Sequence, residues 1–284
     1  MHAAAISPRG GVRGTAGLRC HPQPANQVTN TVDSGTDGGN FISAEEKAYQ
    51  EAMKTVVNKD AKDWTLDEQK AAATDIAKNG MSSVVYAKAM AAMDAGTRWS
   101  VKLKNGKTMT YQIIGINHDD LADGSGKAGL TFMTGYRTFG DHRINSGDTT
   151  TGGWEQSELR QKMNSDEVWN LLPSYFQSKV QTVTKLTNNT KGQDQNSSVT
   201  STNDKLFLPS STEHWGDKDS DGAQYELYKE KGCTSSTDNR AYIWSSVWTR
   251  SLVGNYGFRC TDNDGCPNWS VPQGANSVFP AFCL

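Results

Sequence analysis

Two short acidic runs carry oxygen donors at spacings that suit a calcium ion. Residues 217–222 read Asp-Lys-Asp-Ser-Asp-Gly, with oxygen donors at the first, third and fifth positions and glycine at the sixth, as in a calcium-binding loop. The twelfth position is Tyr228 instead of a bidentate glutamate, so a solvated turn is the alternative for Asp217–Asp221. Residues 262–265, Asp-Asn-Asp-Gly, are ordinary turn residues. We predict no metal site, with calcium at Asp217–Asp221 as the open alternative.

Two histidines stand beside aspartates, an arrangement that could suggest acid/base chemistry. His118 precedes Asp119, and His142 follows Asp141. Neighbours in a strand point to opposite faces, so residues adjacent in sequence rarely form a dyad. The sequence also has no nucleophile elbow, phosphate loop or His-Glu metal motif. We therefore interpret both as loop histidines and predict no catalytic residues and no cofactor.

Five cysteines, at positions 20, 233, 260, 266 and 283, leave at least one unpaired. Cys260 and Cys266 lack the second close pair that a zinc site needs. A disulfide that restricts the loop and two unlinked thiols are the other interpretations of this pair. Cys283 lies in an apolar run and is expected to be a small buried side chain.

The elements that must position any site begin with two N-terminal parts. Residues 1–40 are polar and rich in glycine and proline, so we predict that they are disordered. Residues 41–96 predict three alanine-rich helices, with capping signals at Ser43 and Thr65, a stop at Gly80 and a third helix over 83–95. Their apolar stripes are thin, so we expect this segment to pack on a neighbour or to attach the chain to an assembly.

Residues 97–284 change to a β pattern and form the main predicted domain. Alternating apolar residues on both sides of Asn105-Gly106 predict a hairpin with a type I′ turn. Further strands are expected at 129–134, 180–186, 205–208 and 242–248, helices at 152–160 and 166–172, and a polar loop at 188–203. Short strands, few helices and long loops predict an α+β fold with much irregular surface.

Composition excludes several classes of protein. The 29 Lys+Arg against 31 Asp+Glu give a net charge of −2, which indicates no nucleic-acid-binding surface. No stretch approaches the roughly 20 apolar residues of a membrane span, and residues 1–40 lack the apolar core of an export signal. Eight tryptophans favour a folded module with aromatic layers or an aromatic binding face.

The C-terminal 37 residues place a polar, irregular segment between two apolar anchors. Trp248 opens this segment, and the anchor Val278–Leu284 closes the chain. We predict that the anchors are buried and that the residues between them form a displayed surface. Trp154, Trp248 and Phe282 are expected in the core, and Arg250, like Arg160, is expected to be the buried partner of a carboxylate.

An ordered series of motifs over residues 97–284 resembles a large bacterial and phage domain family of unknown function. The motifs are Gly152-Gly153-Trp154-Glu155 with Arg160, Leu208-Pro209-Ser210, Trp248-Thr249-Arg250-Ser251 and Pro280-Ala281-Phe282. The resemblance implies a C-type lectin-like fold related to formylglycine-generating enzymes, preceded here by the small helical segment. Thr249 and Phe279 depart from the family pattern, which often has an aliphatic residue and an arginine there. The paired active-site cysteines of formylglycine-generating enzymes have no match, so their activity does not carry over.

Several members of that family are similar to the variable proteins of diversity-generating retroelements. In those proteins mutation strikes adenines, so asparagine codons yield mainly Asn, Tyr, Asp, Ser, Gly, Phe, Cys and Arg. Residues 255–268 draw heavily on that set, whereas Trp269 and Gln273 do not and would be fixed. The same composition also suits any exposed loop, so diversification and an ordinary fixed surface both stay open.

These observations predict a non-enzymatic protein that binds a surface protein or a glycan, on a phage virion or a bacterial cell surface. The helical segment 41–96 would support homo-oligomers or attach the chain to a phage tail or cell envelope. The alternatives are a structural virion or envelope component and an oxidase of the formylglycine-generating type. The predicted ligand-binding residues are Asn255, Tyr256, Phe258, Arg259, Asp262, Asn263, Asp264, Asn268, Trp269, Ser270 and Asn276.

Overall fold

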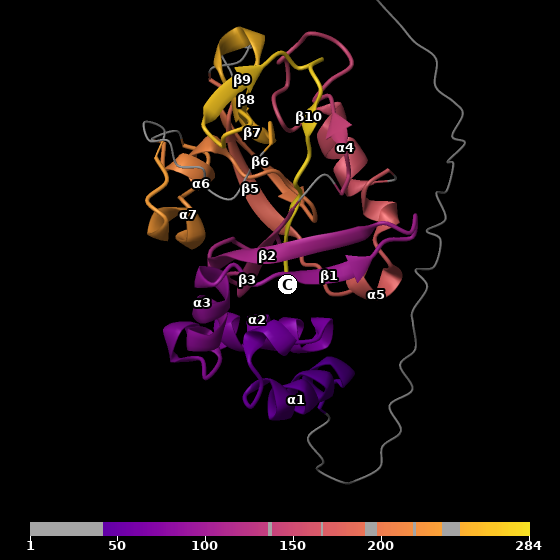
Figure 1. Ribbon diagram of the computed structural model, residues 1–284, viewed down its shortest axis with the longest axis vertical. Helices are drawn as coiled ribbons and strands as arrows, with labels where there is room; N and C mark the ends of the chain where they lie inside the picture. Colours follow the sequence, from indigo (N-terminus) through magenta and orange to yellow (C-terminus); the bar gives the residue numbers. More distant parts are fainter. Residues whose placement is uncertain (1–41, 136–137, 166, 191–197, 218–219, 235–244) are drawn as a thin grey trace, which may run out of the picture. The chain divides into compact units, whose positions relative to one another are not determined.

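Small antiparallel sheets, short helices and long connections make up the protein, which confirms the α+β prediction (Figure 1). The computed structural model describes residues 42–135, 138–165, 167–190, 198–217, 220–234 and 245–284, and residues 42–284 form one compact unit. The predicted disordered segment 1–40 lies outside the described residues. The α-helices are α1 (Ala44–Val56), α2 (Leu66–Asn79), α3 (Tyr86–Asp94), α4 (Glu158–Asn164), α5 (Ser174–Gln177), α6 (Ser211–Trp215) and α7 (Glu226–Glu230).

The largest sheet joins the start of the β region to the end of the chain. Its order is β1 (Trp99–Lys102), β2 (Thr108–Ile116), β3 (Leu130–Thr134) and β11 (Ala281–Cys283). Phe282 of β11 pairs with Phe132 of β3, and their rings stack with centroids 5.4 Å apart. Tyr111 of β2 packs edge-on against both rings. The C-terminal anchor is therefore a core strand. The chain leaves this sheet after β3 and returns to it only at β11.

The hairpin predicted at Asn105-Gly106 is present, but its turn type is different. Trp99 pairs with Tyr111 and Val101 with Met109, as the alternation requires. A type I′ turn needs positive φ at both central residues, whereas only Gly106 (φ 82°) has it and Asn105 does not. Leu103 N donates to Lys107 O at 2.8 Å, and glycine supplies the left-handed position of a longer loop.

The helical segment shares its core with this sheet. Thr65 and Glu68 form a complete capping box at the start of α2, which ends at Gly80 (φ 55°) as predicted. α2 lies between α1 and the sheet (Figure 1) and approaches so closely that a Cβ on Gly129 would stand 1.8 Å from Ala73 O. Trp99 Nε1 also donates to the carbonyl of Ala61 in the 3-10 helix η1 (Ala61–Asp63). The thin apolar stripes are thus buried against the chain's own β-strands.

The chain segment between β3 and β11 forms the smaller sheets. They are formed by β4 (Asp141–His142) with β10 (Asn276–Ser277), β5 (Val183–Asn188) with β6 (Val199–Asp204), and β7 (Trp248–Leu252) with β8 (Phe258–Thr261) and β9 (Pro267–Ser270). The predicted polar loop at 188–203 is wrong at Asn188, which ends β5, and at 199–203, which belong to β6; residues 189, 190 and 198 lie outside the strands, and 191–197 are outside the described part. Residues 205–208 form only an isolated bridge at Phe207. The strand expected at 242–248 begins at Trp248, and residues 242–244 lie outside the described part.

No helix in the described part of the chain combines the length and the apolarity that crossing a bilayer requires.

Candidate ligand-binding surface

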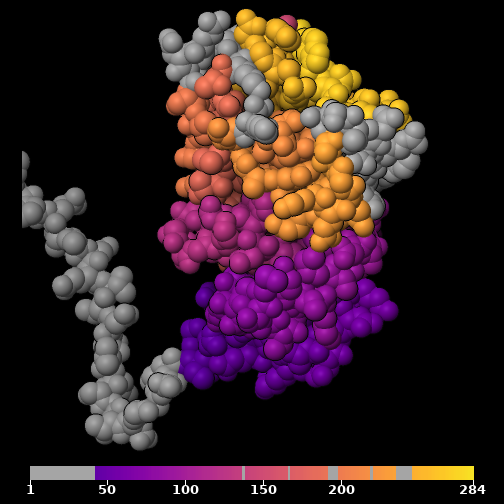
Figure 2. Space-filling model, turned by 90° about the vertical axis from the view of Figure 1, so that its left-hand side faces the viewer, coloured from indigo at the N-terminus to yellow at the C-terminus, as the bar shows by residue number. Residues whose placement is uncertain are grey.

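The sheet β7–β8–β9 positions most of the predicted ligand-binding residues. Figure 2 shows residues after 245 (yellow) at one end of the compact unit and the helical segment (indigo) at the other, whereas the final strand β11 belongs to the largest sheet. β8 and β9 form a hairpin in which Arg259 lies opposite Trp269 and Cys260 opposite Asn268. The hairpin turn is closed by Asp262, whose Oδ1 accepts from the backbone N of Asp264 (2.8 Å) and of Cys266 (2.9 Å). The acidic run 262–265 is therefore a turn, as predicted.

Two aromatic side chains stand out from this end of the molecule. Tyr256 is 56 % exposed and Trp269 is 48 % exposed. Their ring centroids are 5.2 Å apart with planes at 67°, an edge-to-face pair. The pair holds both rings in place while leaving about half of each accessible. Half-buried Arg259 lies across the strand from Trp269, so an aromatic and a cationic group share one face.

The predicted ligand-binding residues divide into exposed and buried ones. Exposed or half-buried are Asn255, Tyr256, Arg259, Asp262, Asn263, Asp264, Asn268, Trp269 and Ser270. Phe258 and Asn276 are buried, so assigning them to a displayed surface is wrong. Phe258 alternates with Arg259 along β8 and therefore points to the opposite, inner face. Asn276 pairs with His142, and its Oδ1 accepts from Ser246 Oγ at 2.6 Å.

The free edge of β9 is poorly suited to adding another strand. β9 is the edge of the sheet. Thr261 N donates to Val247 O on the β7 side, so Arg259, two residues earlier on β8, also directs its backbone groups away from β9, and its partner Trp269 directs its own away from β8. Pro267 has no N–H to offer, and the Trp269 N–H donates to its neighbour Asn268 Oδ1 at 2.8 Å. The outward donors of this edge are thus absent or taken. A ligand is expected to contact side chains here instead of extending the sheet.

Gly257 allows the backbone to pass close under the aromatic pair. A Cβ at this position would lie 2.7 Å from Ser270 O and 3.0 Å from Trp269 Cε3. Any side chain would therefore push β9 and the Trp269 ring outward. The glycine that separates Tyr256 from Phe258 in sequence sets the position of Trp269.

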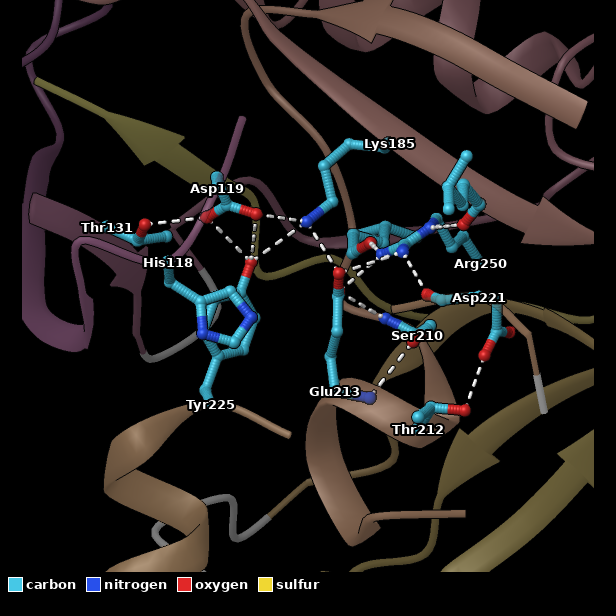
Figure 3. A network of polar contacts seen from close by, with 12 residues as sticks. His118, Asp119, Thr131, Lys185, Ser210, Thr212, Glu213, Asp221, Tyr225 and Arg250 are labelled. Carbon is cyan, nitrogen blue, oxygen red and sulfur yellow. Dashed lines mark hydrogen bonds and ion pairs between the residues drawn. The ribbon is translucent and has the colours of Figure 1, made fainter. Parts of the chain in front are cut away.

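Behind this surface, Arg250 of β7 is completely buried and uses every donor of its guanidinium group (Figure 3). Nη1 and Nη2 contact the two carboxylate oxygens of Glu213 at 2.5 and 2.9 Å. Nε donates to Leu186 O, Nη1 to Leu208 O and Nη2 to Asp221 O, at 3.0, 2.8 and 2.6 Å. Arg250 thereby joins β7 to β5 and to the start of α6. The prediction that it is the buried partner of a carboxylate is confirmed.

Lys185 continues this arrangement to a second carboxylate. Its Nζ lies 2.5 Å from Glu213 Oε1 and forms a short ion pair with Asp119. Asp119 also accepts from Tyr225 Oη, at 3.1 Å from each oxygen, and from Thr131 Oγ1 at 2.6 Å. Figure 3 shows these groups converging from separate strands, loops and helices.

The four charged groups are held ionised by one another. Burial opposes ionisation of Asp119, but Lys185 holds its pKa well below the usual range. Burial likewise opposes ionisation of Glu213, and Arg250 followed by Lys185 lowers its pKa. The pKa of Lys185 is raised, because Asp119 and Glu213 outweigh its own burial. Two anions and two cations thus balance without access to solvent, which suits a structural framework and not a ligand site.

Of this network, only Arg250 is predicted from the sequence. Apart from Val183, the inner face of the β5–β6 hairpin is polar, with Lys185 opposite Thr202, while Leu186 and Val199 face solvent. An apolar-inward pattern therefore assigns the wrong residues to the core. One signal was available, since Ser210 and Glu213 form a capping box that marks α6 and places Glu213.

A second ion pair, between half-buried Arg160 and fully buried Asp204, fixes the anchor Trp154, so Arg160 has the predicted carboxylate partner but is not itself buried. Arg160 Nε donates to Asp204 Oδ1 at 2.7 Å, and Trp154 Nε1 donates to Asp204 Oδ2 at 3.2 Å. A Cβ on Gly153 (φ 54°) would stand 2.0 Å from Asn189 Oδ1. The four predicted anchors Trp154, Trp248, Arg250 and Phe282 are all buried.

The remaining candidates for chemistry have ordinary partners. Asp221 accepts from Thr212 Oγ1 (2.5 Å) and Ser251 Oγ (2.6 Å), and residues 218–219 of the calcium-like run lie outside the described part. Among the described residues, no group of three or more His, Cys, Asp or Glu is placed to hold a metal. Cys260 is a buried free thiol and so is not bridged to Cys266.

The two histidines next to aspartates differ from each other. The loop prediction is wrong for His142, which lies in strand β4, where its Nε2 contacts Phe139 O at 2.9 Å. His118 does lie in a loop, after β2, but its ring packs on Tyr225 with centroids 4.2 Å apart and its Nδ1 lies 3.1 Å from Glu226 Oε1. It covers the outer end of the buried network.

Comparison with known proteins gives one match. A family model described as a domain of unknown function, DUF6273, matches residues 128–284, which is more than half of the chain. No curated protein and no solved structure matches.

Proposed function

The chain belongs to the DUF6273 family of domains of unknown function, and we propose that it is a non-enzymatic ligand-binding protein. The ligand contacts the outer face of β8 and β9 together with the loop before β8. The observation that carries this proposal is the half-exposed pair of Tyr256 and Trp269, held edge-to-face on a sheet whose inner side is fixed by buried ion pairs.

The chemistry of this face suits protein–ligand recognition. Tryptophan, tyrosine and arginine contribute most of the binding energy in typical interfaces. Here Trp269, Tyr256 and Arg259 lie close together, and exposed asparagines and aspartates around them supply adaptable hydrogen bonds. The ligand class is a surface protein or a glycan.

The finer proposals rest on the sequence resemblance. They are a C-type lectin-like fold, a place on a phage virion or bacterial cell surface, attachment through the helical segment, and diversification of the C-terminal surface by a retroelement. Exposure of Asn255, Asn263 and Asn268 supports the last proposal, because variable positions must not disturb the core. Phe258 and Cys260 are buried and would be fixed positions in such a protein.

An oxidase of the formylglycine-generating type has less support. Burial raises the pKa of Cys233 and of Cys260 to about 11, which keeps both thiols protonated at neutral pH. A reactive cysteine pair needs the opposite environment. A structural virion component remains the other alternative.

The test is binding of fluorescently labelled protein to a panel of intact bacterial cells. We expect saturable binding by the wild type and its loss in the Tyr256→Ala/Trp269→Ala variant. Tyr175→Ala is the control, because Tyr175 is similarly exposed (57 %) but lies on α5. Protease treatment of the cells removes binding if the ligand is a protein, and periodate oxidation removes it if the ligand is a glycan. Equal binding by the double variant and the wild type would contradict the proposal.

A further inference from the structure

Lys185 is a primary amine enclosed between two carboxylates in the interior of the protein (Figure 3). Its side chain is 3 % exposed, and those of Asp119 and Glu213 are each 2 % exposed. Its Nζ forms an ion pair with Asp119 and lies 2.5 Å from Glu213 Oε1. An amine and a carboxyl group held in contact are the two reactants of an amide bond, and a second carboxylate beside them can move protons between them.

The surroundings of this pair are aromatic and buried. The centroids of the Phe207 and Tyr225 rings lie 4.4 and 5.4 Å from Lys185 Nζ, and both rings are fully buried. The ion pair is the main form of these groups. Transfer of one proton from Lys185 to Asp119 removes both charges at once, and burial favours neutral forms. This transfer produces the two species that react, a free amine and a carboxylic acid.

The two oxygens of Asp119 have different partners and therefore different roles. Oδ2 accepts from Thr131 Oγ1 at 2.6 Å, so negative charge that develops on Oδ2 during an attack on the carboxyl carbon is stabilised. Oδ1 is the oxygen in contact with Lys185, and it is the one that leaves. Arg250 binds both oxygens of Glu213, which keeps Glu213 Oε1 beside the amine.

We propose that Lys185 and Asp119 form an intramolecular amide bond in the folded chain, with Glu213 as the group that transfers protons. Lys185 Nζ gives one proton to Asp119 Oδ1 and then attacks the carboxyl carbon of Asp119. Glu213 takes a second proton from the attacking nitrogen and returns it to Oδ1, the C–Oδ1 bond breaks, and one water molecule is released. The reaction consumes no oxidant, reductant or cofactor. The charges of Lys185 and Asp119 disappear together, and Glu213 keeps Arg250 as its counter-ion.

The bond joins two distant parts of the fold. Asp119 follows β2 of the largest sheet, Lys185 lies on β5, and the two residues are 66 positions apart in the sequence. A covalent link that closes a long loop restricts the unfolded chain and thereby stabilises the folded one. Until the bond forms, the two groups behave as the ion pair described above. The inference is independent of ligand binding, because neither residue lies on the β8–β9 surface.

The test is the mass of the purified full chain, measured intact after incubation of the folded protein. We expect the wild type to be lighter than its unlinked chain by one water molecule. Lys185→Arg keeps the positive charge but has no primary amine, so it should keep the full mass. Digestion of the wild type should give a branched peptide in which Lys185 is joined to Asp119. Lys127 and Asp120 are a control within the same chain, because they are ion-paired at 2.8 Å but exposed and should stay unlinked.

Glu213→Gln tests the proton transfer. It preserves the size of the side chain and removes the group that accepts the proton, so the bond should form at least about a hundredfold more slowly. Far-UV circular dichroism identifies the variants that are folded. If a variant at these buried positions does not fold, the peptide map of the wild type still decides whether the bond exists.

Three results would overturn the proposal. The first is a folded wild type that keeps the full mass after prolonged incubation. The second is a loss of water that the peptide map places elsewhere, for example at Asp264 before Gly265, since such an aspartate can lose water by cyclising. The third is bond formation at the wild-type rate in folded Glu213→Gln, which would exclude Glu213 as the proton-transfer group.

Discussion

β7 and β9 belong to the same sheet, yet they reverse the usual distribution of polar and apolar side chains. Arg250 on β7 is completely buried, whereas Trp269 on β9 is about half exposed. Arg250 is buried because five acceptors surround it, three backbone carbonyls and the two oxygens of the balancing Glu213 carboxylate. Trp269 is exposed because β9 is the sheet edge, where its ring packs against Tyr256 and over the backbone at Gly257. In this fold, the available partners decide burial more than side-chain polarity does.

Removing the guanidinium group should produce the largest effect. Arg250→Leu leaves three carbonyl groups without a donor and leaves Lys185 as the one cation shared by the buried carboxylates of Asp119 and Glu213, so we expect the free energy of unfolding to fall by about 5 kcal/mol. The measurement is urea denaturation followed by tryptophan fluorescence. Arg259→Leu on the neighbouring strand is the matched control and should change stability by less than about 1 kcal/mol. Similar values for the two variants would contradict the contrast between the inner and outer faces.

Truncating Phe258, the inner aromatic residue of β8, should cause the second largest loss of stability. Phe258 is fully buried, so Phe258→Ala should lower the free energy of unfolding by about 3 to 4 kcal/mol. Trp269→Ala, one strand away on the outer face, should cost about 1 kcal/mol or less. The same denaturation experiment compares them, and a larger loss for Trp269→Ala would show that the faces are assigned the wrong way round.

His214 should make the protein sensitive to acid. It stacks on Tyr228 with centroids 4.3 Å apart, and neither ring nitrogen has a hydrogen-bond partner among the described residues. Burial lowers the pKa of His214 to about 4. Between pH about 6.5 and 4 the unfolded state binds a proton that the folded state does not. Stability should therefore fall as pH falls through this window, by on the order of 2 to 3 kcal/mol.

The check on His214 is a series of denaturation midpoints from pH 7 to pH 4. His214→Phe keeps an aromatic ring and removes the titrating group, so its midpoints should be flatter over that range. At lower pH both proteins should lose stability, because the stability that ionised Asp119 and Glu213 contribute is complete above the unfolded-state pKa values of about 4 and is lost progressively as pH falls towards their depressed folded-state pKa values. Parallel pH profiles would exclude His214 as the source.

A methyl group at Gly257 should have a smaller effect, directed at the surface. Gly257→Ala places a Cβ against Ser270 O and the Trp269 ring, so we expect about 1 to 3 kcal/mol of destabilisation and a displaced Trp269. Binding to cells should weaken more than stability alone explains. Gly274→Ala, also close to Ser270, is a control that does not contact Trp269. Unchanged binding by Gly257→Ala would argue against a fixed position of the aromatic pair.

Local patterns were sufficient to predict the helical segment and the first hairpin. The capping residues Ser43 and Thr65, the stop at Gly80 and the alternation around Asn105-Gly106 depend on interactions within a few residues. The turn type was wrong because Lys104 also joins the loop, which leaves only Gly106 in the left-handed region. Burial of the C-terminal run Val278–Leu284 could be predicted because an apolar segment of this length is unfavourable in contact with water.

The candidate surface was predicted in part. Tyr256 and Trp269 were identified correctly as exposed, but Phe258 was not, because its position depends on a strand alternation hidden by the irregular segment 254–257. The Asp119–Lys185–Glu213–Arg250 network could not be predicted as a unit. Its members come from sequence positions far apart, and burial of a charged residue can be predicted only when its partner is known. Strand β6 was not predicted because its inward residues are polar; one of them, Asp204, accepts hydrogen bonds from Arg160 and Trp154.

The most direct test of the central claim is a binding titration of the Tyr256→Ala/Trp269→Ala variant on the bacterial cells that the wild type binds. Thermal unfolding is measured on the same samples. The proposed role of the aromatic pair predicts an affinity loss of at least about tenfold with nearly the same unfolding temperature. Unchanged affinity in the folded variant would contradict it, and the ligand-binding site would then lie elsewhere on the molecule.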